Sequence, residues 1–90
     1  MKRNLVCWKE LLTEAMEENN EAWNDIVSNT MSEEEMRRPF DSWPSSGREG
    51  IPFTVWTHNS VYFPVTYDGR EWVERVARNP DGKPTEHIGG

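Results

Sequence analysis

The chain has 90 residues, enough for one domain, and a formal net charge of −6 at pH 7. Only 34% of the residues are hydrophobic, but five Trp, three Phe and two Tyr indicate a folded domain, because disordered chains are poor in aromatic residues. No run of about 18 apolar residues is present to span a membrane. The single cysteine excludes a disulfide scaffold, and the acidic balance argues against direct binding of nucleic-acid phosphates.

The N-terminal residues do not fit a secretory signal. Lys2 and Arg3 are followed by apolar residues, but the charge of Lys9 interrupts that stretch before it reaches the roughly 7–15 apolar residues that a signal peptide needs. The unpaired Cys7 is typical of a reducing compartment. We therefore expect a cytoplasmic protein without a membrane segment.

Residues 5–28 have the periodicity of an amphipathic helix. At about 100° per residue, the apolar side chains fall on one arc and the acidic side chains on the opposite arc. Asn19 and Asn20 interrupt this pattern, because asparagine has low helix propensity and Asn19 falls within the apolar arc. The sequence predicts either two helices in phase, broken near these asparagines, or one helix in which Asn19 is a buried polar group with a partner.

A second, short helix is predicted after Thr30. Ser32 and Glu35 have the spacing of a capping box, in which each side chain accepts a hydrogen bond from the other residue's backbone. Pro39 ends this helix, because the residue before a proline avoids the helical conformation. Residues 39–52 contain three Pro, two Gly and three Ser, and we expect them to form a loop.

The C-terminal half has the pattern of an antiparallel sheet. Residues 53–57, 61–67 and 71–78 are rich in β-branched and aromatic side chains, and residues 84–88 are a candidate edge strand. Asp68-Gly69 predicts a two-residue type I′ turn that pairs the residues on either side of it.

His58-Asn59 predicts a second tight turn in this sheet. Pro64 cannot donate a hydrogen bond to a neighbouring strand, so a bulge or a sheet edge is expected there.

The two turns determine which side chains share a face of the sheet. The more apolar face is expected to pack on the helices, and it carries Trp56, Val61, Phe63, Val65, Trp72 and Val76. The other face is mixed and is expected to meet water, and it carries Tyr62, Thr66, Glu71, Val73 and Arg75. We therefore predict a single α+β domain: a helical, acidic half (1–38), a loop (39–52), and an antiparallel meander of three or four strands (53–88).

No residues with the pattern of a catalytic or metal centre emerge. Cys7 with His58 or His87 would supply a nucleophile and a base, but Cys7 lies beside the acidic arc, where negative charge disfavours a thiolate. The two histidines are 29 residues apart, and no cysteine cluster accompanies them. We assign no catalytic residue, no metal and no cofactor, and rank a small enzyme or metal protein last.

Two sets of residues are candidates for binding a partner protein. The first set is Phe40, Trp43 and Tyr62. Trp43 and Tyr62 are expected to be exposed, because one is in the loop and the other on the mixed sheet face, whereas Phe40 in the loop either covers the core or faces a partner. Carboxylates recur along one face of the predicted helix, and they are Glu10, Glu14, Glu17 and Glu21. The main hypothesis is a non-enzymatic protein-interaction module. The alternative is a nucleic-acid mimic, in which the carboxylates imitate phosphates and block a basic groove. A second copy of the chain would also cover the apolar arc, so a homodimer stays open.

Several runs in the C-terminal part of the chain resemble a group of known proteins. The runs are Pro52–Thr57 (PFTVWT), Val61–Val65 (VYFPV), Tyr67–Gly69 (YDG), Glu71–Val73 (EWV), Arg78–Pro80 (RNP) and His87–Gly90 (HIGG). They resemble small uncharacterised proteins encoded by bacteriophages and prophages. The resemblance covers the strand-rich half of the chain, whereas the helical half is similar in character only. It implies a bacterial cytosol and a host protein as the target, and it implies no catalytic residue.

Overall fold

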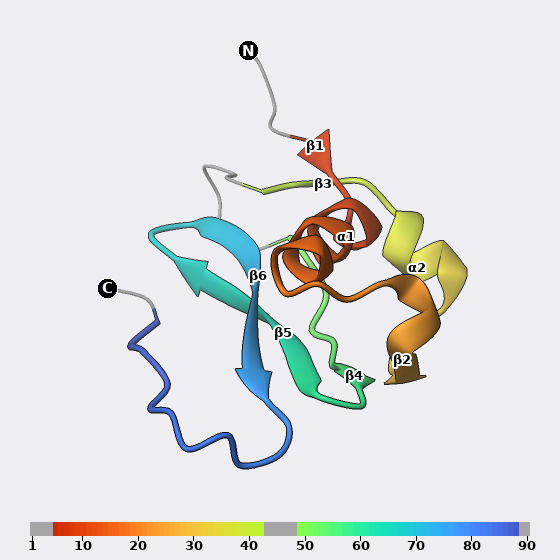
Figure 1. Ribbon diagram of the computed structural model, residues 1–90. Helices are drawn as coiled ribbons and strands as arrows, with labels where there is room; N and C mark the ends of the chain where they lie inside the picture. The colour runs from red at the N-terminus through yellow and green to blue at the C-terminus, as the bar shows by residue number, and fades with distance from the viewer. Residues whose placement is uncertain (1–4, 43–48, 89–90) are drawn as a thin grey trace.

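The protein is described by a computed structural model that covers residues 5–42 and 49–88. Along the chain the elements are β1 (Leu5–Val6), α1 (Trp8–Glu18), a 3₁₀ turn (Trp23–Asp25), β2 (Ile26–Asn29), α2 (Glu33–Arg37), β3 (Phe40–Asp41), β4 (Val55–Thr57), β5 (Ser60–Tyr67) and β6 (Arg70–Ala77). The strands form two antiparallel sheets, one of β1-β3 and one in the order β2-β4-β5-β6. This is the predicted α+β class of fold, with α1 and α2 next to each other (Figure 1).

Helix α1 confirms the first part of the predicted amphipathic helix. Trp8, Leu12, Ala15 and Met16 are spaced to share one face, and all four are buried. The helix ends where the asparagines predict a break. The Asn19 side chain donates to the Ala15 carbonyl at 2.8 Å, and Asn20 has a φ of 58°, a left-handed conformation that asparagine tolerates better than most residues.

The predicted helical continuation through residues 22–28 is wrong. Trp23–Asp25 forms only one 3₁₀ turn, and Ile26–Asn29 is β2, which pairs with β4 with a register shift between Ile26 and Ser28. The apolar pairs there are spaced as in a helix, but so short a run does not separate a helix from a strand. The β-branched Ile26 and Val27 fit a pleated strand, and the edge of β4 supplies the pairing partner.

Helix α2 begins at the predicted capping box. Ser32 Oγ accepts the Glu35 N–H at 3.1 Å, and Glu35 Oε1 accepts the Ser32 N–H at 2.8 Å. The helix ends at Arg37, before Pro39, as expected. The predicted loop over residues 39–52 is interrupted by β3, because the backbone of Phe40–Asp41 pairs with β1 at the start of the described chain.

Both predicted hairpin registers are confirmed. In the β4–β5 hairpin, Val55 pairs with Tyr62, and in the β5–β6 hairpin Tyr67 pairs with Arg70. Asp68 and Gly69 have φ angles of 52° and 81°, the positive values that a type I′ turn requires.

Pro64 lies at a sheet edge, one of the two outcomes expected for it. The β4–β5 pairing extends no further along β5 than Tyr62, whereas the β5–β6 pairing continues through Pro64. The N–H that proline lacks is therefore not required.

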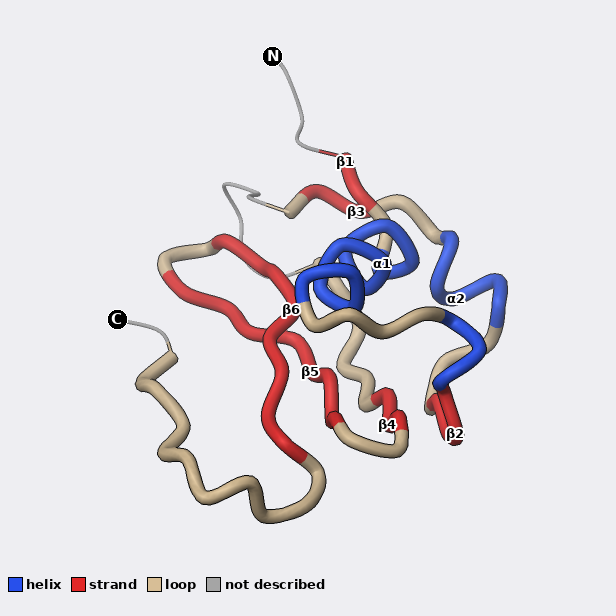
Figure 2. Tube along the Cα trace, viewed as in Figure 1, coloured by secondary structure: helices blue, strands red, loops and turns tan. Residues whose placement is uncertain are grey.

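The fourth strand of the sheet is β2 and not the predicted edge strand at residues 84–88. Residues 78–88 contain no helix or strand, and they run beside the sheet well apart from α1 and α2 (Figure 2). The sheet is therefore a three-stranded meander with an edge strand contributed by the N-terminal half of the chain.

The core lies between the helices and one face of the four-stranded sheet. At its centre the Trp8 ring contacts Phe40 and Phe53, with ring centroids 4.7 and 4.9 Å apart, and Trp8 Nε1 donates to the Ile51 carbonyl at 3.0 Å. The buried apolar cluster comprises Trp8, Leu12, Ala15, Met16, Met31, Met36, Phe40, Phe53, Val55 and Tyr62.

The predicted assignment of the two sheet faces is wrong. The face toward the core, here called the inner face, is formed by Val55, Thr57, Ser60, Tyr62, Glu71 and Val73. The opposite face, here called the outer face, carries Glu74 and six apolar residues: Trp56, Val61, Phe63, Val65, Trp72 and Val76. The register is as predicted, but the sheet lies with its more polar face toward the core, because each buried polar side chain there has a hydrogen-bond partner.

Candidate functional site

The rings predicted to bind a partner are not on the described surface. Phe40 is 7% exposed and packs on Trp8, and Tyr62 has an exposure of 0%. The expected exposure of Tyr62 is therefore wrong, because this residue is on the inner face. Phe40, in β3, follows the first of its two alternatives and covers the core. Trp43 lies outside the described residues.

Glu21 lies apart from the other three glutamates that were predicted to bind a partner. Because the chain turns at Asn20, the Glu21 side chain reaches the inner face, where it accepts hydrogen bonds from the Tyr62 hydroxyl at 2.5 Å and the Thr57 hydroxyl at 2.7 Å. Burial opposes ionisation of this carboxyl, but hydrogen bonds from Thr57, Tyr62 and Ser60, together with the charge of Arg75, lower its pKa below the usual value.

The Tyr62 hydroxyl is held in its neutral form by the same contact. Burial raises the pKa of Tyr62 strongly, and the bond to the Glu21 carboxylate raises it further. Thr57 also accepts the backbone N–H of Ser60 at 2.9 Å. Glu21 and Tyr62 therefore fasten the turn after α1 to the inner face, a structural role that neither residue type reveals in the sequence.

The remaining predicted carboxylates are exposed. Glu10, Glu14 and Glu17 lie on the solvent side of α1, and none of them forms an ion pair within the described ranges 5–42 and 49–88. Glu10 accepts a weak hydrogen bond from the Cys7 thiol at 3.3 Å. Because Glu10 and Glu17 are seven positions apart in α1, they are separated by about 10 Å along the helix axis.

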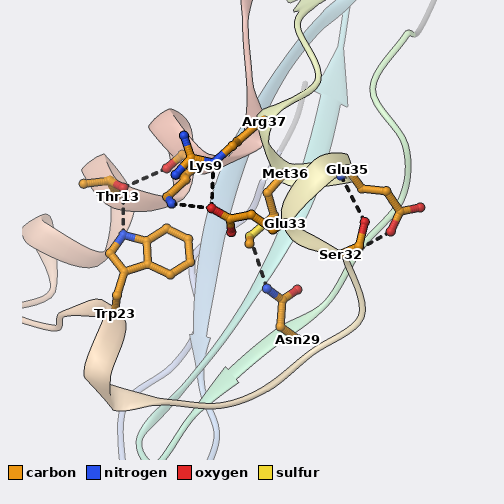
Figure 3. A network of polar contacts seen from close by, with 9 residues as sticks. All are labelled: Lys9, Thr13, Trp23, Asn29, Ser32, Glu33, Glu35, Met36 and Arg37. Atoms are coloured by element: carbon orange, nitrogen blue, oxygen red, sulfur yellow. Dashed lines mark hydrogen bonds and ion pairs between the residues drawn. The ribbon is translucent and has the colours of Figure 1, made fainter.

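A separate polar network joins α1 to α2 (Figure 3). Glu33 Oε1 accepts from Lys9 Nζ at 2.9 Å and from Arg37 Nε at 2.6 Å, and these two cations lower the pKa of the Glu33 carboxyl. Trp23 Nε1 donates to Thr13 Oγ1 at 2.9 Å, and Lys9 Nζ lies 5.5 Å from the centre of the Trp23 ring. The charges of this network compensate each other, unlike those on the exposed side of α1.

The outer face carries six apolar residues that are only partly covered by the rest of the described protein. These six residues are Trp56, Val61, Phe63, Val65, Trp72 and Val76. None of them belongs to the core cluster or to the partly buried residues packed against it. Cross-strand pairing places Trp56 beside Val61, Val61 beside Val76, and Val65 beside Trp72. Phe63 is paired with Glu74, whose carboxylate lies on the same face beside Trp72.

The borders of the outer face differ in character. Tyr67, at the end of β5 near the type I′ turn, is 52% exposed and extends the aromatic surface. Trp72 Nε1 donates to Glu74 Oε2 at 2.7 Å, so the polar end of this ring is already satisfied. Residues 85–88 lie near Trp72 and Glu74 and leave a cavity of about 250 Å³. The sequence correctly predicts that the six apolar residues of the outer face share one face, but the prediction that this face packs on the helices is wrong.

The described residues contain no arrangement typical of catalysis or metal binding. Cys7 precedes α1, His58 is in the β4–β5 turn, and His87 is in the C-terminal segment, so the three come from separate parts of the fold. Across residues 5–42 and 49–88 no three His, Cys, Asp or Glu side chains are grouped closely enough to hold a metal ion. Over those same ranges, neither helix has the length and apolar character needed to cross a membrane.

Comparison with known proteins finds no matching family model, no matching curated protein and no matching solved structure. Function is therefore inferred from the surfaces of this chain.

Proposed function

We propose that this protein is a non-enzymatic interaction module that binds a partner protein through its outer face. The observation that carries the proposal is that six apolar side chains share a sheet face outside the core. Continuous exposed apolar patches are typical of protein-binding surfaces. Trp56 and Trp72 supply large, rigid side chains of the kind that dominate the binding energy of interfaces.

The rest of the surface supports a protein as the partner. The net charge of −6 disfavours a phosphate backbone and favours a partner with a basic surface. The resemblance of the strand region to bacteriophage and prophage proteins supports a bacterial host protein as the partner and the cytoplasm as the place of binding.

The first test is capture of a partner from bacterial lysate by the tagged protein, at low and at high salt. A single stoichiometric partner that persists at high salt is expected, because apolar contacts are not screened by salt. Phe63→Thr and Trp72→Thr should each remove that partner while the circular dichroism spectrum is retained. A Tyr67→Phe variant, which keeps the ring at the border of the outer face, is the matched control.

Two results would contradict this proposal. Retention of the partner by both outer-face variants would exclude the outer face as the binding surface. A stable dimer in light scattering that is lost in Phe63→Thr would show that a second copy of the chain, and not a host protein, occupies the face.

The exposed carboxylates of α1 support a second candidate function, mimicry of nucleic acid. Glu10, Glu14 and Glu17 carry three negative charges without an ion pair among the described residues, over about 10 Å of helix. Binding through them would weaken steeply with salt. Replacing all three by Gln would abolish it and leave binding through the outer face intact, so the same capture experiment separates the two functions.

A further inference from the structure

Glu71 is buried, and only one of its two carboxylate oxygens accepts hydrogen bonds from the described residues. It is 5% exposed and lies on the inner face at the start of β6. Its Oε2 accepts the backbone N–H groups of Glu49 and Gly50, each at 3.0 Å. The carboxylate lies so close to this segment that a Cβ at Gly50 would be 2.7 Å from Oε1. Oε1 itself has no hydrogen bond among residues 5–42 and 49–88.

The free oxygen is not sealed inside the protein. No side-chain oxygen or nitrogen of the described residues is both fully buried and unpartnered, so Oε1 retains access to a small space. Glu71 lines a cavity of about 80 Å³, whose other walls include Ile51, Pro52, Pro64, Val65 and Thr66. This volume exceeds the roughly 10–15 Å³ that one water molecule requires. It suits the end group of a long side chain.

The cavity lies where β5 is paired with β6 on one side but not with β4 on the other. The pairing of β4 with β5 stops at Tyr62, and the segment around residues 50–52 runs beside residues 64–66 without pairing with them. Two of the wall residues, Pro52 and Pro64, have no backbone N–H to offer the carboxylate. Among the described residues, the walls contain no cationic side chain either. The buried Glu71 carboxylate therefore lies at a cavity whose described walls supply no positive charge.

We propose that this cavity is a binding site for a guanidinium group, presented as an arginine side chain by a partner protein. The guanidinium donates to Glu71 Oε1, and its planar faces and methylene stem contact the proline and aliphatic walls. A single carboxylate is too few ligands to retain a metal ion. The negative net charge of the chain attracts a cationic group toward the site.

The site adjoins the outer face but does not depend on it. Val65 belongs to both, so a partner that lies on the outer face has a short path to the cavity. The guanidinium proposal is nevertheless tested with a small probe, and its outcome is independent of whether any protein binds the outer face.

The experiment is a titration of the full, ¹⁵N-labelled chain with N-acetyl-arginine methylamide, followed by amide chemical shifts. Saturable shifts at Gly50, Ile51 and Thr66 are expected, with a dissociation constant in the millimolar range. The neutral citrulline analogue, which keeps the shape of the side chain, should give none. Equal shifts from citrulline, or shifts spread over α1, would overturn the proposal.

Glu71→Gln is the matched variant. The Gln oxygen still accepts the N–H groups of Glu49 and Gly50, whereas an NH₂ group replaces Oε1 and repels the guanidinium. Affinity should fall about tenfold or more. Glu10→Gln removes the same charge from α1 and should leave the affinity unchanged within about twofold. Equal affinity of the Glu71→Gln and wild-type chains for the probe would contradict the site.

A second variant keeps the test decisive if Glu71→Gln does not fold. Thr66→Phe places a ring at the mouth of the cavity from an exposed position and leaves the hydrogen bonds of Glu71 in place. It should abolish the shifts caused by the arginine probe. A folded Thr66→Phe protein that binds the probe as tightly as the wild type would overturn the proposal.

Discussion

The burial of the two faces of the four-stranded sheet is the opposite of what their composition suggests. The inner face carries Thr57, Ser60, Tyr62 and Glu71 and is buried, whereas the outer face carries six apolar residues beside Glu74 and stays partly exposed. Each of these inner polar residues has at least one hydrogen-bond partner from another element of the fold, which offsets the cost of burying it. The comparison teaches that satisfied hydrogen bonds, and not hydrophobicity alone, decide which face of a sheet becomes the core.

Neighbouring residues on opposite faces give the sharpest test of this comparison. Tyr62→Ala should lower the free energy of unfolding by about 3–5 kcal/mol, because it empties a fully buried site and leaves Glu21 without its donor. Phe63→Ala should cost only about 1 kcal/mol, because its ring is partly exposed already. Urea unfolding of both variants measures the difference. Equal costs would mean that the outer face is also covered.

Loss of the hydrogen bond between Tyr62 and Glu21 is expected to have the next largest effect on the free energy of unfolding. Tyr62→Phe keeps the ring but removes the donor, and should cost about 1.5 kcal/mol, as expected for a bond to a carboxylate. Tyr67→Phe, at an exposed position of the same strand, is the control and should change stability by less than about 0.5 kcal/mol. If the two substitutions cost the same, the Glu21 contact does not hold the turn to the inner face.

The same contact predicts how stability depends on pH. The pKa of Glu21 is lower in the folded protein than its usual value of 4.5, so its stabilisation is present above that value and is lost as the pH falls through the folded pKa. Unfolding free energies between pH 7 and acid should therefore fall less steeply for Glu21→Gln than for the wild type. Glu14→Gln, a charge-matched change on the exposed side of α1, should leave the slope of the wild type.

Tyr62 predicts how stability changes at alkaline pH. Its pKa is raised on folding, so its stabilisation is complete below about pH 10 and is lost as the pH rises through the folded pKa. The alkaline fall in stability should shrink in Tyr62→Phe. An unchanged alkaline limb would show that the hydroxyl is not held neutral by burial and Glu21.

The features that could be predicted from the sequence are those that depend on interactions between residues close together along the chain. The Asp68-Gly69 turn, the capping box of Ser32 and Glu35, and the break at Asn20 each depend on neighbours within the same turn. Their positions and the hairpin registers were therefore predicted correctly.

The features that were missed depend on partners far apart along the chain. Tyr62 is 41 residues from Glu21, Glu71 is 21 residues from Gly50, and Thr54 bonds Thr30 alongside β2 at a separation of 24 residues. Residue types alone do not reveal such partners. For that reason the sequence predicts the opposite orientation of the sheet and a helix at β2, and it gives no signal of the Glu71 cavity.

Valine-to-threonine substitutions on the two faces are expected to have the smallest effect on stability, and they also test whether the outer face binds a partner. Threonine has nearly the shape of valine but adds a hydroxyl that must be hydrogen-bonded. Val55→Thr buries that hydroxyl on the inner face and should cost about 1 kcal/mol, whereas Val61→Thr on the outer face leaves it near water and should cost almost nothing. Chemical denaturation gives both values. If Val61→Thr is as stable as the wild type yet loses its captured partner, the outer face serves binding and not folding. If it loses stability as Val55→Thr does, that face is part of the core.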